Sequence, residues 1–269
     1  FVGDSLELAQ KATTVDADVI VFCGVHFMAE TAKILNPTRT VLLPDLRAGC
    51  SLADSVDADD LTERAEELRK VHPDLQVACY VNTTAAVKAV CDVCVTSANA
   101  TQIIERLPSQ NILFVPDENL ARYVQSTTTK NIIAWNGNCY VHHQITPEQI
   151  DNVRKHLPHV KVIVHPECRS DVLKLADAVL STSGMIKYAK ESDAQEFLVV
   201  TECGLSDRLL LEVPEKSFYK SCKLCAYMKM ITLPDTRRAL EEMRFEVELD
   251  EDVRARAERS LRRMLELSA

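Results

Sequence analysis

Glycine is scarce in this chain, and long apolar runs are missing. Only six glycines occur among the 269 residues, and neither glycine-rich phosphate-binding fingerprint, G-x-G-x-x-G or G-x-x-x-x-G-K-[ST], is present. Because both fingerprints use glycine to bring the backbone close to phosphate oxygens, their absence argues against the common nucleotide-binding enzymes. No apolar run approaches the ~18 residues of a membrane-spanning helix. No basic segment followed by a short apolar segment is found either, so no signal peptide is expected.

Positive charge is also in short supply. The formal net charge is −9 and the sequence pI is about 5.3, which argues against binding to nucleic acid or to an anionic membrane. Hydrophobic residues make up 46% and charged residues 26%, a composition typical of a globular protein. Ten cysteines are present. We expect a cytoplasmic protein, in which cysteines serve as metal ligands more often than as a disulfide framework.

The chain contains a threefold internal repeat. Each copy has an aspartate, an apolar strand, a turn of small polar residues, a helix and a second apolar strand. The copies begin at Asp18, Asp92 and Asp177 and close at Pro44, Pro116 and Thr201, respectively. In the second and third copies a further apolar strand precedes the aspartate, at 77–80 and 162–165. Strands that alternate with helices predict parallel sheets, because parallel strands need helical crossovers.

The predicted fold is therefore α/β, with three similar small αβα units and parallel sheets in a pseudo-threefold arrangement. We place the units at residues 1–54, 55–140 and 141–269. The first unit has a helix within residues 1–17, with Ser5 as its possible N-cap, but no strand before it, so we expect its first strand to be missing. The third unit is expected to include a C-terminal amphipathic helix over 250–267.

Polar residues follow the predicted strands at corresponding positions of the repeats. Ligands of open parallel sheets bind beyond the carboxyl ends of the strands, so these side chains are candidates for a binding site. A hydroxyl there is often only a helix N-cap, but its recurrence in all three copies favours a site. The candidates of this kind are Gly24, His26, Tyr80, Asn82, Thr96, Ser97, His165, Glu167, Thr182 and Ser183, with Ser5 at the start of the first helix.

One cysteine follows the closing strand of each copy: Cys50, Cys139 and Cys225. One thiol from each repeat is what a metal site on the repeat axis would need. Three thiolates suit either an iron–sulfur cluster with one open iron or a zinc ion with an open fourth position, and the repeats do not choose between them.

The other cysteines receive mostly structural interpretations. We interpret Cys23, Cys79, Cys94 and Cys203 as small buried apolar residues, and we leave Cys168 and Cys222 open. The two C-x-x-C motifs, Cys91/Cys94 and Cys222/Cys225, lie too far apart in the chain for a zinc ribbon, whose pairs are separated by about 15–20 residues.

Several longer motifs resemble those of the quinolinate synthase A family of bacterial and archaeal NAD biosynthesis. The resemblance runs over essentially the whole chain and rests on GDSLELAQKA, VIVFCGVHFMAETAKILNP, LLPDLRAGCSLADS, YVNTTAAVKA, TSANA, WNGNCYVHH, VHPEC and STSGM. It implies three α/β domains around a central [4Fe–4S] cluster with three cysteine ligands, which correspond to Cys50, Cys139 and Cys225. The close neighbour Cys222 leaves the third ligand the least secure of the three.

The same resemblance implies an activity: condensation of iminoaspartate with dihydroxyacetone phosphate to quinolinate, phosphate and water. An L-aspartate oxidase or an aspartate dehydrogenase would be the upstream source of iminoaspartate. The implied substrate contacts are Ser5, Tyr80, Asn82, Ser97, His142, His165, Glu167 and Thr182. As the one carboxylate of the set, Glu167 is the candidate general base, with Tyr80, His142 and His165 as proton carriers. The family's H-N-Y-Q-like motif has no counterpart in this chain, which starts after it, so we expect two active-site residues to be lacking.

Two other classes of protein use a similar set of residues. A zinc-dependent hydrolase or lyase would bind its metal through the same thiolates, and a non-catalytic iron–sulfur protein would need the cluster alone. The second alternative leaves the hydroxyls, imidazoles and Glu167 without a purpose, although polar groups are costly to place in an interior.

Overall fold

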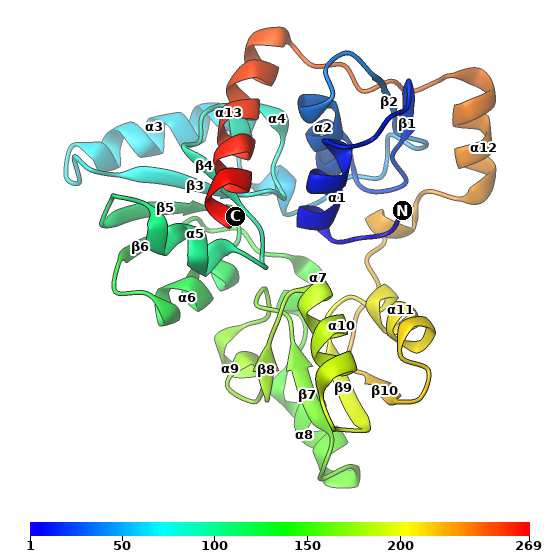
Figure 1. The fold of residues 1–269 in the computed structure, drawn as a ribbon. Helices are drawn as coiled ribbons and strands as arrows, with labels where there is room; N and C mark the ends of the chain where they lie inside the picture. Colours follow the sequence, from blue (N-terminus) through cyan, green and yellow to red (C-terminus); the bar gives the residue numbers. More distant parts are fainter.

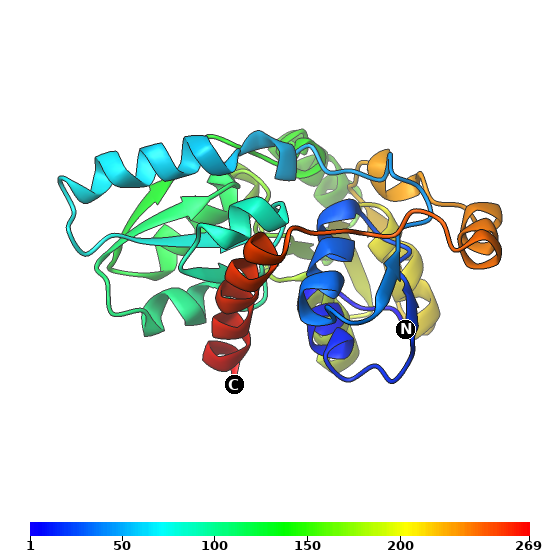
Figure 2. The same cartoon turned by 90° about the horizontal axis from the view of Figure 1, so that it is seen from above.

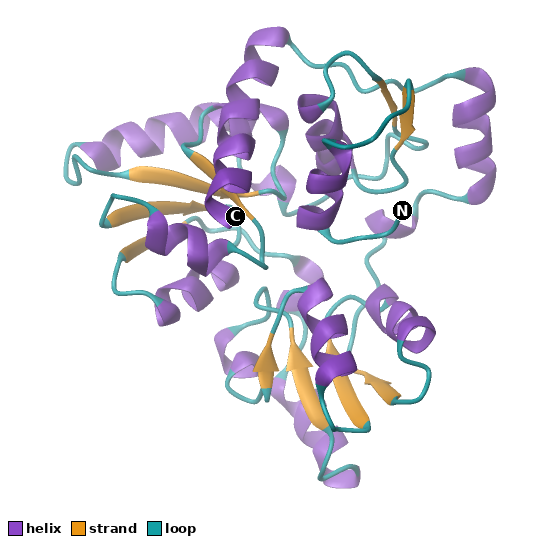
Figure 3. Ribbon diagram, viewed as in Figure 1, coloured by secondary structure: helices purple, strands orange, loops and turns teal.

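Three separate parallel sheets define the architecture of the computed structural model, which describes all of residues 1–269 (Figures 1 and 3). Helices lie against the sheets, so the predicted α/β class with parallel sheets in several layers is confirmed. Each strand of the repeats that the sequence predicts is present, although most end one or two residues earlier than the apolar run.

The first sheet has two parallel strands that pair directly with each other. Helix α1 begins the chain, and its N-cap is Asp4 rather than Ser5, because the Asp4 carboxylate accepts the N–H groups of Leu6 and Glu7. Ser5 is instead the first helical residue. The elements of this part are α1 (Ser5–Ala12), β1 (Val19–Val21), α2 (His26–Leu35), β2 (Thr40–Leu42), the 3₁₀ turn η1 (Ala53–Ser55) and α3 (Ala58–Arg69).

The second and third sheets each have four strands and the same strand order, β4-β3-β5-β6 and β8-β7-β9-β10. The second sheet and its helices comprise β3 (Gln76–Tyr80), α4 (Ala85–Ala89), β4 (Val93–Val95), α5 (Ala100–Arg106), β5 (Asn111–Val115), α6 (Glu118–Thr127) and β6 (Asn131–Ala134). The third comprises α7 (Tyr140–His143), α8 (Pro147–His156), β7 (Lys161–Val164), α9 (Ser170–Leu173), β8 (Ala178–Val179), α10 (Thr182–Glu191), β9 (Glu196–Val200), α11 (Gly204–Glu212) and β10 (Ser217–Lys220).

The repeated aspartates make the same contact in these two sheets. Asp92 accepts the N–H of Val77 at 2.7 Å, and Asp177 accepts the N–H of Val162 at 2.8 Å. Each carboxylate thus binds the backbone at the start of the central strand and helps to set the strand pairing.

The C-terminal part of the chain returns to the first and second sheets. After η2 (Tyr227–Lys229), α12 (Leu233–Glu242) contacts β1, and Glu246 forms an antiparallel bridge with Leu42. The following segment crosses the molecule to α13 (Glu251–Ser268), as Figure 2 shows. Helix α13 packs on α4, β4 and α5, with Ala257, Leu261 and Met264 fully buried. The sequence predicts this helix correctly but groups it with the third unit, whereas it packs mainly on the second sheet and its helices and also contacts α2.

The largest hydrophobic core lies around the second sheet and includes the buried face of α13. Smaller cores flank the third sheet and fill the space between α2 and β2. None of the helices has the length and apolar character needed to span a membrane.

Candidate active site

One cavity of about 290 Å³ gathers every site residue that the resemblance implies. Of the other strand-end candidates, Gly24 and Thr96 line it too, whereas His26 and Ser183 do not. It lies where the carboxyl ends of strands from all three sheets come together. The predicted residues that line it are Ser5, Cys50, Tyr80, Asn82, Ser97, Cys139, His142, His165, Glu167, Thr182 and Cys225. Residues more than two hundred positions apart in the chain therefore share one space.

The parallel topology explains why these side chains meet. Tyr80 is the last residue of β3, His165 follows β7, and Thr182 begins α10 directly after β8. In parallel sheets all carboxyl ends face the same edge, where side chains leave the sheet and point into a crevice.

Glu167 is at the centre of a buried polar cluster. The Tyr80 hydroxyl donates a hydrogen bond of 2.6 Å to Glu167 Oε1. Nδ1 of His142 lies 3.1 Å from Oε2, a contact without the alignment of a full hydrogen bond, and Nδ1 of His165 lies 3.7 Å from Oε1. All four side chains are at most 7% exposed. The carboxylate is thus surrounded by potential proton donors and shielded from water.

These contacts shift the protonation equilibria of the cluster. Burial alone would raise the pKa of Glu167, but the His142 and His165 imidazoles and the Tyr80 hydroxyl outweigh it and hold the pKa at about 2. Burial lowers the pKa of His165 to about 3, and it raises the pKa of Tyr80 well above its usual value, as does the Glu167 charge. Near neutral pH the cluster therefore has an ionised Glu167, a neutral His165 and a protonated Tyr80.

The two histidines are fixed relative to each other and to two hydroxyls. Their rings stack with centroids 4.7 Å apart. Nε2 of His142 lies 2.8 Å from the Thr201 hydroxyl, and Nε2 of His165 lies 3.3 Å from the Ser97 hydroxyl. Thr201 follows β9 and lines the cavity. The sequence pattern indicates Thr201 only as the end of a strand and does not predict its contact with His142. Its strand-end position, like those of the other candidates, is the signal that could have identified it.

Several polar groups of the cavity can bind a small molecule. The Asn82 side-chain oxygen is buried and has no hydrogen-bond partner within the protein. Ser5 and Thr182 are the first residues of α1 and α10, and both line the cavity. At α10 unpaired N–H groups and the helix dipole favour an anion, whereas at α1 the Asp4 carboxylate already accepts two of these N–H groups. The cavity therefore offers an acceptor, two hydroxyls and one anion-binding helix end.

The three predicted metal-ligand thiols line the cavity beside this cluster. The N–H groups of Leu52 and Ala53 point at the Cys50 sulfur, and those of Val141 and His142 point at the Cys139 sulfur. Burial raises the pKa of Cys50 to about 11, and it raises the pKa of Cys139 even further. Such thiols are protonated in the free protein, whereas a bound metal ion deprotonates its thiol ligands.

The loops that carry Cys139 and Cys225 have matching hydrogen bonds to their sheets. Gly137 forms an isolated parallel β-bridge with Asp117, and Lys223 forms one with Glu202. Gly137 and Lys223 each lie two residues before the cysteine of their loop. Gly137 fits only as glycine, since a Cβ there would lie 2.3 Å from the Ser55 hydroxyl. The correspondence pairs Cys139 with Cys225 and not with Cys222. Cys222 is joined to Cys203 in a disulfide, so its sulfur is not a free thiol in this structure.

The remaining cysteines fit the sequence prediction only in part. Cys79 and Cys94 are fully buried in neighbouring strands, as predicted, and Cys168 is also buried. The prediction is wrong for Cys23, which is exposed because β1 ends two residues earlier. It is also wrong for Cys203, which caps α11 and lies close enough to the Cys222 loop to form the disulfide.

A second group of possible metal ligands lies in the cavity. Ligand atoms of Cys139, His142 and Glu167 lie within 4.8 Å of one another and could also hold a metal ion.

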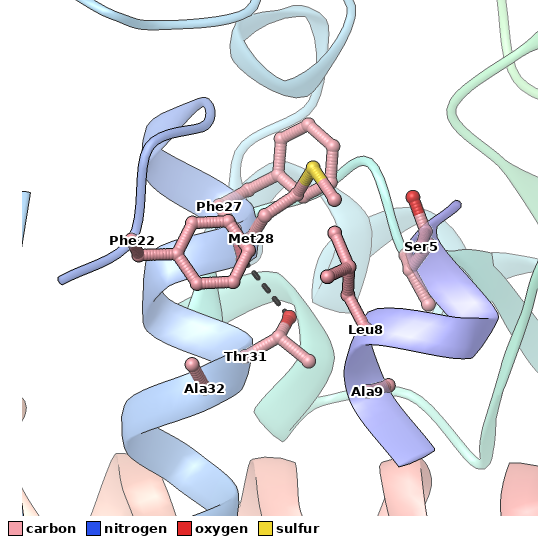
Figure 4. Close-up of a pocket in the computed structure, with 9 residues that line it drawn as sticks. Ser5, Leu8, Ala9, Phe22, Phe27, Met28, Thr31 and Ala32 are labelled. Carbon is pink, nitrogen blue, oxygen red and sulfur yellow. Dashed lines mark hydrogen bonds between the residues drawn. The ribbon is translucent and has the colours of Figure 1, made fainter. Parts of the chain in front are cut away.

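A second pocket, between α1 and α2, has a volume of only about 10 Å³ and is lined mostly by apolar side chains such as Leu8, Phe22 and Met28 (Figure 4). An apolar gap of this size is at the lower limit for one water molecule. It is a packing gap beside the wall of the cavity, not a binding site.

An α/β fold whose strand ends enclose a cavity with thiols, imidazoles and a buried carboxylate defines a class: an enzyme that acts on a small molecule. Comparison with known protein families identifies the member of that class. The family model described as "Quinolinate synthetase A protein" matches residues 1–266. The chain therefore belongs to the quinolinate synthetase A protein family and is an enzyme.

Individual relatives agree with the family assignment. A quinolinate synthase of Dehalococcoides mccartyi (strain CBDB1) is 51% identical over 267 residues, which cover 98% of this chain and 87% of the relative. Quinolinate synthase 1 of Methanosarcina acetivorans is 50% identical over 267 residues, 98% of this chain and 86% of the relative. The quinolinate synthase of Xylella fastidiosa (strain 9a5c) is 48% identical over 264 residues, 98% of this chain and 77% of the relative.

Proposed function

We propose that this protein condenses iminoaspartate with dihydroxyacetone phosphate to form quinolinate, with release of phosphate and water, in NAD biosynthesis. The observation that carries the proposal is a single cavity that is lined both by the three thiols and by the buried polar side chains around Glu167. Family membership supports the same reaction. We further propose a cytoplasmic location and a supply of iminoaspartate by an L-aspartate oxidase or an aspartate dehydrogenase.

The proposed cofactor is a [4Fe–4S] cluster held by Cys50, Cys139 and Cys225, with the three α/β units in a pseudo-threefold arrangement around it. The donor set supports the cluster, because the sulfurs of Cys50 and Cys139 already face backbone N–H groups that would stabilise a thiolate. When bound, a cluster with three thiolate ligands leaves one iron open, and that iron would polarise a substrate oxygen as a Lewis acid.

The chain's own residues would bind and orient the substrates. The N-terminal end of α10 suits a carboxylate or phosphate group. The hydroxyls of Ser5 and Thr182 would donate hydrogen bonds to such groups. The unpartnered oxygen of Asn82 would accept a hydrogen bond from a substrate hydroxyl or N–H. Ser97 would donate to a charged substrate group while it holds the His165 ring.

Proton transfer would involve the residues around Glu167. The condensation requires the loss of water, and therefore a group that removes a proton and one that protonates the leaving oxygen. With a pKa held near 2, Glu167 is a weak base, and its contacts suit it to orienting His142 and the Tyr80 hydroxyl. The roles proposed from the sequence remain open between these two: a base at Glu167, or a base at Tyr80 or His142 that Glu167 positions.

Anaerobic purification followed by iron, sulfide and quinolinate assays tests the proposed function. We expect a brown protein, and we expect single replacement of Cys50, Cys139 or Cys225 by serine to abolish stable cluster binding. Cys94→Ser is the matched control, because Cys94 is fully buried in β4 and should leave the iron content unchanged. A colourless protein with zinc would favour a zinc enzyme. Loss of the iron–sulfur cluster in Cys222→Ser but not in Cys225→Ser would show that the third ligand is Cys222 and not Cys225.

A further inference from the structure

A carboxylate accepts a hydrogen bond from the backbone N–H of two of the three proposed metal-ligand cysteines. Asp117 follows β5 and Glu202 follows β9, at corresponding positions of the second and third repeats. Asp117 Oδ2 accepts the N–H of Cys139 at 3.1 Å, and Glu202 Oε1 accepts the N–H of Cys225 at 3.2 Å. Both side chains are buried, with 0% and 8% of their surface exposed.

The second oxygen of each carboxylate binds the start of the next helix. Asp117 Oδ1 accepts the N–H of Leu120 in α6 at 2.7 Å, and Glu202 Oε2 accepts the N–H of Gly204 in α11 at 2.7 Å. Each side chain therefore connects a helix N-terminus, which is rigidly attached to its sheet, to the backbone of one cysteine. Removal of the carboxylate would leave both N–H groups without the acceptor that they have in the structure, and a buried donor without a partner is costly.

The surrounding backbone contacts repeat as well. The N–H of Glu118 donates to the Gly137 carbonyl at 2.7 Å, and the N–H of Cys203 donates to the Lys223 carbonyl at 3.3 Å. The two cysteine loops are thus held in the same way although their sequences differ. Such repetition indicates that the position of the cysteine backbone matters in both units.

The first repeat lacks this arrangement. Its corresponding carboxylate, Asp45, accepts the N–H of Arg47 at 2.9 Å and pairs with the Arg47 guanidinium at 2.6 Å, and it makes no contact with Cys50. The chain therefore contains an internal control: a carboxylate at the same repeat position that does not hold a ligand cysteine.

We propose that Asp117 and Glu202 are positioning residues that hold the backbones of Cys139 and Cys225 in place for metal binding. The proposal rests on the proposed function, because it takes these cysteines as the ligands. Neither carboxylate needs to touch the metal. Each acts by restricting the loop, so that the sulfur is pre-organised and the metal need not order it.

Asparagine and glutamine variants separate this role from a general structural one. Asparagine caps helices as well as aspartate does, so Asp117→Asn keeps the acceptor for Leu120 but faces the Cys139 N–H with an amide donor. Glu202→Gln has the same effect at Cys225 and provides a second, independent test if the first variant does not fold. Asp45→Asn makes the same substitution at the corresponding repeat position, where the side chain binds Arg47 and not a cysteine.

The first measurement is amide hydrogen exchange in the full-length, reduced, metal-free chain labelled with [¹⁵N]cysteine. In Asp117→Asn we expect the Cys139 amide to exchange about 10- to 100-fold faster than in the parent, because its N–H then faces an amide donor in place of an acceptor. The buried amides of Cys79 and Cys94, in the same sheet, should keep their parental rates. Parental exchange at Cys139, or equal acceleration at all three amides, would overturn the proposal.

The second measurement is the rate at which a chelator removes iron from the anaerobically prepared holoprotein. We expect iron loss at least 10-fold faster in Asp117→Asn and Glu202→Gln, in line with the usual effect of removing groups behind a metal ligand, and parental loss in Asp45→Asn. Unchanged iron loss in the first two variants would contradict the proposal. If the parent itself binds no iron, the proposed function is wrong, and the exchange measurement still decides whether the carboxylates hold the cysteine loops.

Discussion

Replacement of Glu167 by glutamine should destabilise the protein without disturbing its shape. The carboxylate is 3% exposed and binds the Tyr80 hydroxyl at 2.6 Å. Its pKa is about 2 in the folded protein against an ordinary value of 4.5, a difference that corresponds to about 3 kcal/mol in the free energy of unfolding. Glutamine has nearly the same volume and still accepts from Tyr80, but it carries no charge.

The sign of the pH dependence follows from the lowered pKa. A carboxyl group with a lower pKa in the folded state stabilises the protein above its unfolded pKa, and this contribution is lost as pH falls toward the folded pKa. The parent and Glu167→Gln should therefore differ most at neutral pH, and their free energies of unfolding should converge between pH 4.5 and 2. Urea unfolding at a series of pH values measures this difference.

A surface pair provides the matched control. The Tyr219 hydroxyl donates to Glu196 at 2.9 Å in a pair near the surface, and solvent weakens such pairs. Glu196→Gln should change the free energy of unfolding by less than about 1 kcal/mol. If Glu167→Gln is as stable as the parent at pH 7, the interpretation of Glu167 as a buried, strongly held anion is refuted.

The same variant separates the two proposed catalytic roles. If Glu167 is the general base, turnover should fall by about 10²–10⁴ while substrate still binds and the visible absorbance of the cluster changes as an intermediate accumulates. If Glu167 only positions its neighbours, turnover should stay near the parental rate. In that case Tyr80→Phe and His142→Gln are the variants that identify the base.

Three further predictions concern other parts of the molecule. Burial lowers the pKa of His165 from 6.5 to about 3, so protonation of the unfolded chain should reduce the free energy of unfolding by up to about 5 kcal/mol as pH falls through this range. In His165→Gln the free energy of unfolding should depend less on pH over this range. An unchanged pH dependence would contradict the interpretation of His165 as a buried, neutral imidazole. Ser97→Ala should weaken dicarboxylate binding by about 1.5–3 kcal/mol, through loss of a hydrogen bond to a charged group, and calorimetry with equal affinities would remove Ser97 from the site. Leu261→Ala should lower the free energy of unfolding by about 2–5 kcal/mol, because the side chain is fully buried between α13 and the second sheet; a loss below 1 kcal/mol would show that α13 does not depend on this contact.

The sequence predicts the central strands and the site better than it predicts the sheet edges. Apolar runs such as Val162–Val164 are buried on both faces and have an unmistakable pattern. The edge strands β6 and β10 are half exposed, with outer residues as polar as Asn131 and Lys220, so nothing in their composition separates them from loops. The sequence does not predict them, because the repeats are recognised only as far as the strands that end before Pro116 and Thr201.

The site residues can be predicted from the sequence because the repeats place equivalent residues at the same edge of each sheet. The contacts between the units cannot be predicted in this way. The partner of His142 is Thr201, and the two residues lie on different elements and far apart in the chain. The packing of α13 is hidden for the same reason. Its amphipathic pattern fixes which face is buried, with Ala257 and Leu261, but says nothing about which sheet that face will meet.

The position of α13 has a consequence for the order in which the chain can fold during synthesis. The second sheet and its helices are complete in sequence by Ala134, yet residues 251–268 cover most of the apolar surface over α4 and β4. While the third unit is being made, that apolar surface has no partner from its own chain. Domains generally fold from the N-terminus as they emerge, and exposed apolar surface promotes aggregation at that stage. The nascent chain thus spends the synthesis of more than a hundred residues with an open core, a period in which binding by a chaperone would be most useful.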